Sequence, residues 1–153
     1  MSFLENVCTA LRQAGVRHAI AGGYAVALHG AVRGTIDVDV VLRWTEQTLI
    51  GAEAALNGIG LVSRLPVTAR EVFAFRDEYV KNRNLIAWNF YNPDDPLEQV
   101  DVIITYDLTG KRTRRVNLPS GPVQVLSVKD LIGMKRASGR PQDIEDIRAL
   151  ERL

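Results

Sequence analysis

The chain has 153 residues and a formal net charge of +1, with 46% hydrophobic and 24% charged residues. These values are typical of an ordinary soluble globular protein, and we expect a single domain over residues 1–153. A net charge this small gives no strong overall electrostatic attraction to nucleic acid or to a membrane surface. The run Lys111–Arg115 is nevertheless a local basic cluster.

The single cysteine, Cys8, excludes an internal disulfide and any metal site built from several cysteines. It lies with Leu4, Val7 and Leu11 at helical spacing, which predicts a thiol packed in the core. No apolar run approaches the ~18 residues of a membrane span, and the N-terminus lacks the pattern of a signal peptide. We therefore expect a cytoplasmic protein that makes no contact with a membrane.

Helices and strands alternate in the first part of the chain. Apolar periodicity, glycines and capping residues mark their limits. The expected elements are a helix over 2–14, a strand over 16–21, a short helix over 24–29, a strand over 35–42, and a helix over 46–56 that Thr45 caps.

Strands dominate the later part, and two helices follow them. Residues 68–80 begin with a capping box but fit neither the helical nor the strand period, so their structure stays open. The expected elements are strands over 61–65, 85–91 and 99–106, a hairpin of 114–118 with 123–126, a helix from Ser127 to Gly139, and a last helix from Pro141. This order predicts an α/β (α+β) architecture with helices packed on a mixed sheet.

Two aspartates occupy the second strand. Asp37 and Asp39 are two residues apart, so their side chains project from one face while Val38 and Val40 face the other way. Neighbouring carboxylates repel each other and are costly to bury unpaired, so they favour a bound cation. The alternative is a solvated face of an edge strand.

Asp101 is a third carboxylate, in a strand of Val100, Val102, Ile103 and Ile104 that we expect to be central. If that strand lies next to the Asp37 strand, three carboxylates converge. Oxygen ligands without histidine or cysteine suit Mg²⁺ or Mn²⁺, and Asp101 is placed to accept a proton from an attacking hydroxyl. The alternative is an aspartate that accepts hydrogen bonds from loop amides.

Gly22 and Gly23 lie between the first strand and a helix. Glycines allow close approach of backbone to a ligand, and N–H groups at a helix start attract phosphate. With a triphosphate on this turn, two metal ions on Asp37 and Asp39 would stabilise both an attacking hydroxyl and a leaving pyrophosphate. A tight turn without a ligand is the alternative.

These motifs resemble the polymerase-beta-type nucleotidyltransferase superfamily. The matching residues are Gly22-Gly23, Arg33, Thr35, Asp37-Val38-Asp39 and Val100-Asp101-Val102. The wider stretch from Gly22 to Asp39 and the tail from Ser127 to Asp146 resemble its bacterial branch of AbiEii-type toxin nucleotidyltransferases.

The resemblance implies transfer of a nucleoside monophosphate from a nucleoside triphosphate such as ATP to an acceptor hydroxyl. Asp37, Asp39 and Asp101 would be the catalytic metal ligands, and Gly22 and Gly23 would contact the triphosphate. Most members have Gly-Ser at this turn, so Gly23 removes a hydroxyl. The acceptor is tRNA, a protein or a small molecule. Larger relatives carry extra domains that help bind the acceptor. The resemblance therefore implies that a homodimer partner or a second protein supplies this contact here. It also implies a role in a toxin–antitoxin system.

Arg33, Thr35 and Lys135 complete the predicted substrate-binding set. The Arg33 guanidinium suits a phosphate, or pairs with a surface carboxylate. Lys135 either points its charge into the cleft or is a solvated lysine at a helix end.

Asp143 and Asp146 are interpreted as structural acids, and the basic run Lys111–Arg115 is either an RNA contact or a charged hairpin rim. A function of a different class remains open: a nucleotide-binding or antitoxin-like module without transferase activity.

Overall fold

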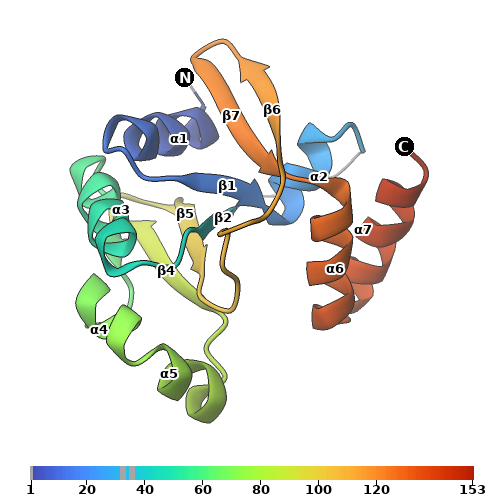
Figure 1. Ribbon diagram of the computed structural model, residues 1–153. Helices are drawn as coiled ribbons and strands as arrows, with labels where there is room; N and C mark the ends of the chain where they lie inside the picture. The colour runs from blue at the N-terminus through green and yellow to red at the C-terminus, as the bar shows by residue number, and fades with distance from the viewer. Residues whose placement is uncertain (1, 32–33, 35–36) are drawn as a thin grey trace.

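Seven strands join in one mixed sheet in the computed structural model of this protein, which describes residues 2–31, 34 and 37–153 (Figure 1). The order across the sheet is β3-β4-β5-β2-β1-β7-β6. The strands are β1 (His18–Ala21), β2 (Val38–Leu42), β3 (Val62–Ser63), β4 (Ala87–Asn92), β5 (Asp95–Ile103), β6 (Thr113–Leu118) and β7 (Gly121–Leu126). The predicted mixed sheet with helices packed on it is confirmed.

The helices form two groups. In Figure 1, α3, α4 and α5 lie on the left of the molecule, whereas α6 and α7 lie together on the right. The helices are α1 (Phe3–Gln13), α2 (Gly22–Leu28), α3 (Glu46–Gly58), α4 (Ala69–Ala74), α5 (Arg76–Arg83), α6 (Val128–Ser138) and α7 (Pro141–Glu151).

Capping residues set the helix starts at the predicted places. Thr45 accepts a hydrogen bond from the backbone of Thr48, and Ser127 accepts one from the backbone of Asp130. Each cap satisfies an N–H group that the first helical turn leaves without a partner. Gly139 ends α6 in the left-handed conformation, at φ 65°.

The segment left open, residues 68–80, forms two short helices. Thr68 and Glu71 make the expected capping box at the start of α4. The pattern was ambiguous because α4 has only six residues and α5 buries none of its eight, so neither shows a sustained apolar face. Asn84, at φ 50°, ends α5 in the left-handed conformation.

Several strand limits differ from the expected ones. The strand expected over 61–65 has only Val62 and Ser63 in β3. The strands expected over 85–91 and 99–106 are instead Ala87–Asn92 and Asp95–Ile103, joined by a tight turn in which the side chain of Asn92 accepts a hydrogen bond from the backbone of Asp94. The helix α3 continues through Gly58 rather than ending at Leu56.

The core lies between the sheet and its helices. Val38, Val40, Val100 and Val102, from the adjacent strands β2 and β5, are fully buried. Cys8 is buried too, and this burial raises the pKa of its thiol to about 12, which confirms the predicted packed thiol. Among the described residues, no helix is long and apolar enough to cross a membrane.

Candidate active site

The two central aspartates lie directly opposite each other. Strands β2 and β5 are parallel neighbours, and their register pairs Asp39 with Asp101. On the other side of β5, Asn89 of β4 pairs with Asp101, and on the other side of β2, Ala21 of β1 pairs with Asp39. The predicted adjacency of the Asp101 strand and its central position are confirmed.

Burial and the repulsion between carboxylates together determine the electrostatics around Asp39 and Asp101. The pKa of Asp39 is raised to about 7, first by burial and then by the charges of Asp101 and Asp37, whereas the charge of Lys135 lowers it. Burial and the charge of Asp101 likewise raise the pKa of Asp37. The three carboxylates are therefore electrostatic neighbours, as the sequence predicted.

Asn89 and Arg64 hold Asp101 in place. The Asn89 side-chain amide donates a hydrogen bond of 2.8 Å to Oδ1 of Asp101, and Nε of Arg64 donates one of 2.8 Å to Oδ1 of Asn89. These two hydrogen bonds link the Arg64 guanidinium to Asn89 and Asn89 to Asp101, and so fix the orientation of the Asp101 carboxylate. Neither residue was predicted from the sequence, although Asn89 alternates with the buried Trp88 and Phe90 and so faces the polar side of its strand.

The carboxylate oxygens of Asp39 and Asp101 suit a divalent cation. In the described part of the chain, no group of three or more His, Cys, Asp or Glu side chains is placed to hold a metal ion by itself. Mg²⁺ is usually bound through one or two carboxylates, with waters and substrate phosphates completing its shell. The paired Asp39 and Asp101 fit that requirement, and the three-aspartate ligand set stays a prediction.

Gly22 lets the chain pass close to Asp39. It has φ 62°, and a Cβ added there would meet Oδ2 of Asp39 and lie 2.7 Å from its Cγ. Both the left-handed conformation and the missing side chain are therefore required at this position. Gly23 is buried in the first turn of α2.

Replacing Gly22 by Ala is expected to destabilise the protein by about 1–3 kcal/mol, because a left-handed alanine is strained and its methyl group displaces Asp39. Urea unfolding followed by circular dichroism measures this difference. The control is Gly58→Ala in α3, where an added Cβ has open space. An equal effect at both positions would contradict the proposed close approach.

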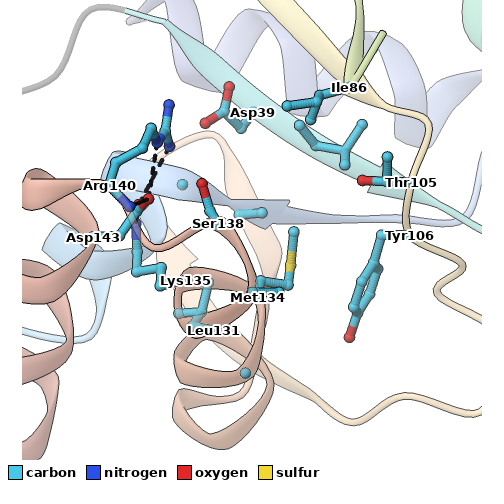
Figure 2. Close-up of a pocket in the computed structure, with 15 residues that line it drawn as sticks. Asp39, Ile86, Thr105, Tyr106, Leu131, Met134, Lys135, Ser138, Arg140 and Asp143 are labelled. Carbon is cyan, nitrogen blue, oxygen red and sulfur yellow. Dashed lines mark hydrogen bonds and ion pairs between the residues drawn. The ribbon is translucent and has the colours of Figure 1, made fainter. Parts of the chain in front are cut away.

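A cavity of about 500 Å³ opens beside Asp39 and Gly22, between the sheet and α6. Figure 2 shows Asp39 and Arg140 facing one end of it, with Met134, Tyr106 and Ile86 toward the other. A cavity of this size with an apolar part and a few convergent polar groups is typical of a small-ligand site.

Lys135 lines this cavity but is engaged with two aspartates. Its Nζ lies 2.8 Å from Oδ2 of Asp146 and 3.6 Å from Oδ1 of Asp143, and all three side chains are buried. The alternative of a solvated lysine is wrong, because this side chain is needed to neutralise two buried acids. The interpretation of Asp143 and Asp146 as structural agrees with these contacts.

Arg140 is the exposed cation of the cavity, and the sequence analysis did not select it. Asp143 accepts hydrogen bonds from Arg140 at Nε (2.8 Å) and from its backbone N–H (3.1 Å), which fixes the guanidinium near Asp39 (Figure 2). The side chain stays 72% exposed, so it is accessible to an anionic ligand. Arg33 and Thr35 of the predicted substrate-binding set lie outside the described residues.

The raised pKa of Asp39 predicts a pH dependence of stability without divalent metal. Because the folded state holds this proton to about pH 7 while an unfolded aspartate loses it near pH 4, the folded chain binds more protons between these values. The free energy of unfolding is therefore expected to fall as pH rises from 4 to 7. Urea titrations in EDTA measure this slope, and Asp39→Asn should reduce it; an unchanged slope would contradict the assignment.

Comparisons with known proteins concern the fold. No protein-family model and no curated protein matches this sequence. A solution structure of the antibiotic-resistance factor ANT(2'')-Ia is similar at TM-score 0.63 and 14% identity, over 97% of this chain and 80% of that one. A crystal structure of ANT(2'')-Ia with adenylyl-2''-tobramycin is similar at TM-score 0.59 and 15% identity, over 95% and 83%.

An antigenic nucleotidyltransferase-like protein from Paracoccidioides brasiliensis is also similar, at TM-score 0.59 and 19% identity, over 96% of this chain and 74% of that one. These identities are too low to assign an activity or an AbiEii-type branch, but the superposed lengths cover nearly all of the chain. The chain has the nucleotidyltransferase fold.

Proposed function

We propose that the protein is a nucleotidyltransferase that uses Mg²⁺ or Mn²⁺ to transfer a nucleoside monophosphate from a nucleoside triphosphate to an acceptor hydroxyl. The observation that carries this proposal is the pairing of Asp39 with Asp101 on adjacent parallel strands beside a cavity of about 500 Å³. A pure binding module has no need of two neighbouring half-buried carboxylates, one of which has its pKa raised to about 7 by burial and by the charge of the other.

Divalent cations on Asp37, Asp39 and Asp101 would supply the positive charge that stabilises the triphosphate oxygens and the leaving pyrophosphate. The bond from the acceptor oxygen to the α-phosphorus forms, and the bond from that phosphorus to the bridging oxygen of the pyrophosphate breaks. The hydroxyl proton passes to the carboxylate of Asp101, which Asn89 holds by its 2.8 Å hydrogen bond.

The cavity supports a nucleotide with its phosphates toward Asp39. Arg140 faces this polar end with an accessible guanidinium, and Gly22 lines it with backbone. Ile86, Met134 and Tyr106 offer apolar and aromatic surface for a base at the other end. The structural neighbour ANT(2'')-Ia was solved with adenylyl-2''-tobramycin, so a protein of this fold binds a nucleotidylated small molecule.

The decisive experiment is transfer of label from each α-labelled nucleoside triphosphate to cellular RNA, to protein and to small hydroxyl compounds, with Mg²⁺ and with EDTA. We expect one class of acceptor to become labelled only with metal. Titration calorimetry with the same nucleotides measures binding separately. Binding without transfer to any acceptor would favour the alternative of an antitoxin-like nucleotide-binding module.

A further inference from the structure

A second cavity, of about 350 Å³, has a different chemistry from the first. Its charged lining consists of Arg17, Arg43 and Lys111, and the rest includes Thr109 and Gly110. No acidic side chain lines it among the described residues. All three cations are exposed, and in the described part of the chain none of them has an ion-pair partner. The protein as a whole has a net charge of only +1, so three cations without ion-pair partners around one cavity are a local concentration of positive charge. Such a concentration favours binding of an anion.

The backbone of the sheet holds these cations together. The register of β1 and β2 pairs His18 with Leu42, so Arg17 and Arg43 flank the same end of two adjacent strands. The backbone N–H of Leu108 donates a 3.0 Å hydrogen bond to the carbonyl of Leu42, which fixes the loop that carries Lys111 to this end of the sheet. The site is therefore built from three separate segments of the chain.

Asp107, the acidic residue nearest to this loop in the sequence, is engaged in hydrogen bonds with backbone N–H groups. Oδ1 of Asp107 accepts hydrogen bonds from the N–H groups of Trp44 (3.0 Å) and Thr109 (2.9 Å). These bonds, with the charge of Arg76, keep the pKa of Asp107 low despite partial burial. Asp107 therefore shapes the loop instead of neutralising the second cavity.

The second cavity lies next to the first. Tyr106 lines the first cavity, and Nζ of Lys111 in the second lies 5.5 Å from the centroid of its ring. Along β2, Asp39 and Arg43 are about 13 Å apart at the usual rise of a strand. A ligand that extends about 13 Å beyond the reacting hydroxyl would therefore span the two sites.

Further positive charge continues from the second cavity along the sheet edge. Arg112, Arg114 and Arg115 are exposed on or beside β6, the outermost strand, where Arg114 and Arg115 point to opposite faces of the strand. An extended track of cations suits a polyanion better than a single phosphate. RNA carries both groups that the two sites require, since each of its units has a backbone phosphate and a hydroxyl.

We propose that Arg17, Arg43 and Lys111 form a binding site for the phosphodiester backbone of an RNA acceptor, beside the nucleotide cavity. This inference rests on the proposed function for the role of the RNA as acceptor, but the binding itself does not depend on catalysis. The basic run Lys111–Arg115 is thereby interpreted as part of an RNA contact rather than as a charged rim.

The test is binding of a fluorescent single-stranded RNA and a fluorescent tRNA, followed by anisotropy from 50 to 400 mM NaCl without nucleotide. The triple variant Arg17→Gln, Arg43→Gln, Lys111→Gln is expected to bind at least about tenfold more weakly at low salt. Its slope of log K against log salt should be smaller by about 2, because each lost contact to a single strand removes about 0.7.

The matched control is Lys81→Gln, Arg83→Gln, Arg152→Gln, which removes the same charge from exposed positions outside both cavities. The proposal is overturned if the wild type binds no RNA at low salt, if the slope is unchanged, or if the control weakens binding equally. It is also overturned if poly-glutamate binds with the same dependence while RNA does not, which would assign the site to an acidic protein.

ATP binding by titration calorimetry separates this proposal from the proposed function. The triple variant should bind ATP as the wild type does, because the nucleotide occupies the first cavity. A loss of ATP affinity with unchanged RNA affinity would assign the second cavity to the triphosphate and overturn the inference. If the wild type binds RNA through these residues but neither binds nor transfers any nucleotide, only the proposed function fails.

Discussion

Asp39→Asn is expected to lower nucleotidyl transfer by at least about 10²–10³-fold, the loss typical of removing one group that stabilises transition-state charge. Asparagine keeps the shape of the side chain but removes the negative charge that would bind the cation. The fold should survive, because the variant removes both the cost of burying a charge and the repulsion from Asp101 and Asp37, which together raise the pKa of Asp39 to about 7. Asp37→Asn is expected to abolish transfer in the same way. Transfer from an α-labelled nucleoside triphosphate gives the rate, and thermal unfolding gives the stability.

Asp94→Asn is the matched control, since this aspartate is exposed at the turn between β4 and β5 and lines neither cavity. It should retain full activity. If Asp37→Asn and Asp39→Asn both retain full activity as well, the proposed active site is wrong. If they lose activity only together with their folded circular dichroism spectrum, the carboxylates are structural.

Lys135→Met is expected to have the largest effect on stability, about 3–5 kcal/mol, because removing one partner leaves buried charges uncompensated. Lys135 is 7% exposed, and Asp143 and Asp146 around it are 1% and 3% exposed. Asp143 keeps Arg140 in this variant, but the ion pair of Asp146 with Lys135 is lost. Urea unfolding at pH 7 measures the difference in the free energy of unfolding.

Lys129→Met provides the control on the same helix, where the side chain is exposed and the expected change is below about 0.5 kcal/mol. The double variant Lys135→Met, Asp146→Leu should recover much of the lost stability, since it removes the uncompensated carboxylate. A loss under 1 kcal/mol for Lys135→Met would contradict the structural role. A stable double variant that no longer binds nucleotide would support the predicted contact of Lys135 with substrate.

Local patterns were sufficient to predict most elements and half of the site. The alternation around Asp37 and Asp39 and the glycines before α2 depend on neighbouring residues, so their geometry follows from strand and turn periodicity. The position of Asp101 was predicted only conditionally. Parallel pairing of β5 with β2 is a long-range choice that no local signal determines.

The residues that were missed act through tertiary contacts. Arg140 looks like a cap before a helix in the sequence, and only the packing of α6 and α7 turns it toward Asp39. Asn89 looks like an ordinary polar residue of a strand, and only the register of β4 with β5 brings it to Asp101. Lys135 was predicted to point its charge into the cleft from its place on a helix, but its burial between two acids depends on the contact of α6 with α7.

The parallel pairing of β2 with β5 also determines when the two paired aspartates meet during folding. All of α3, β3, α4, α5 and β4 lie between Asp39 and Asp101 in the chain. Closing so long a segment is slow compared with forming a local hairpin, so the β2–β5 contact is expected to form late. A newly synthesised chain that has folded only through β2 contains the glycine turn but lacks the opposing aspartate. Asp39 and Asp101 therefore come together only when β5 pairs with β2.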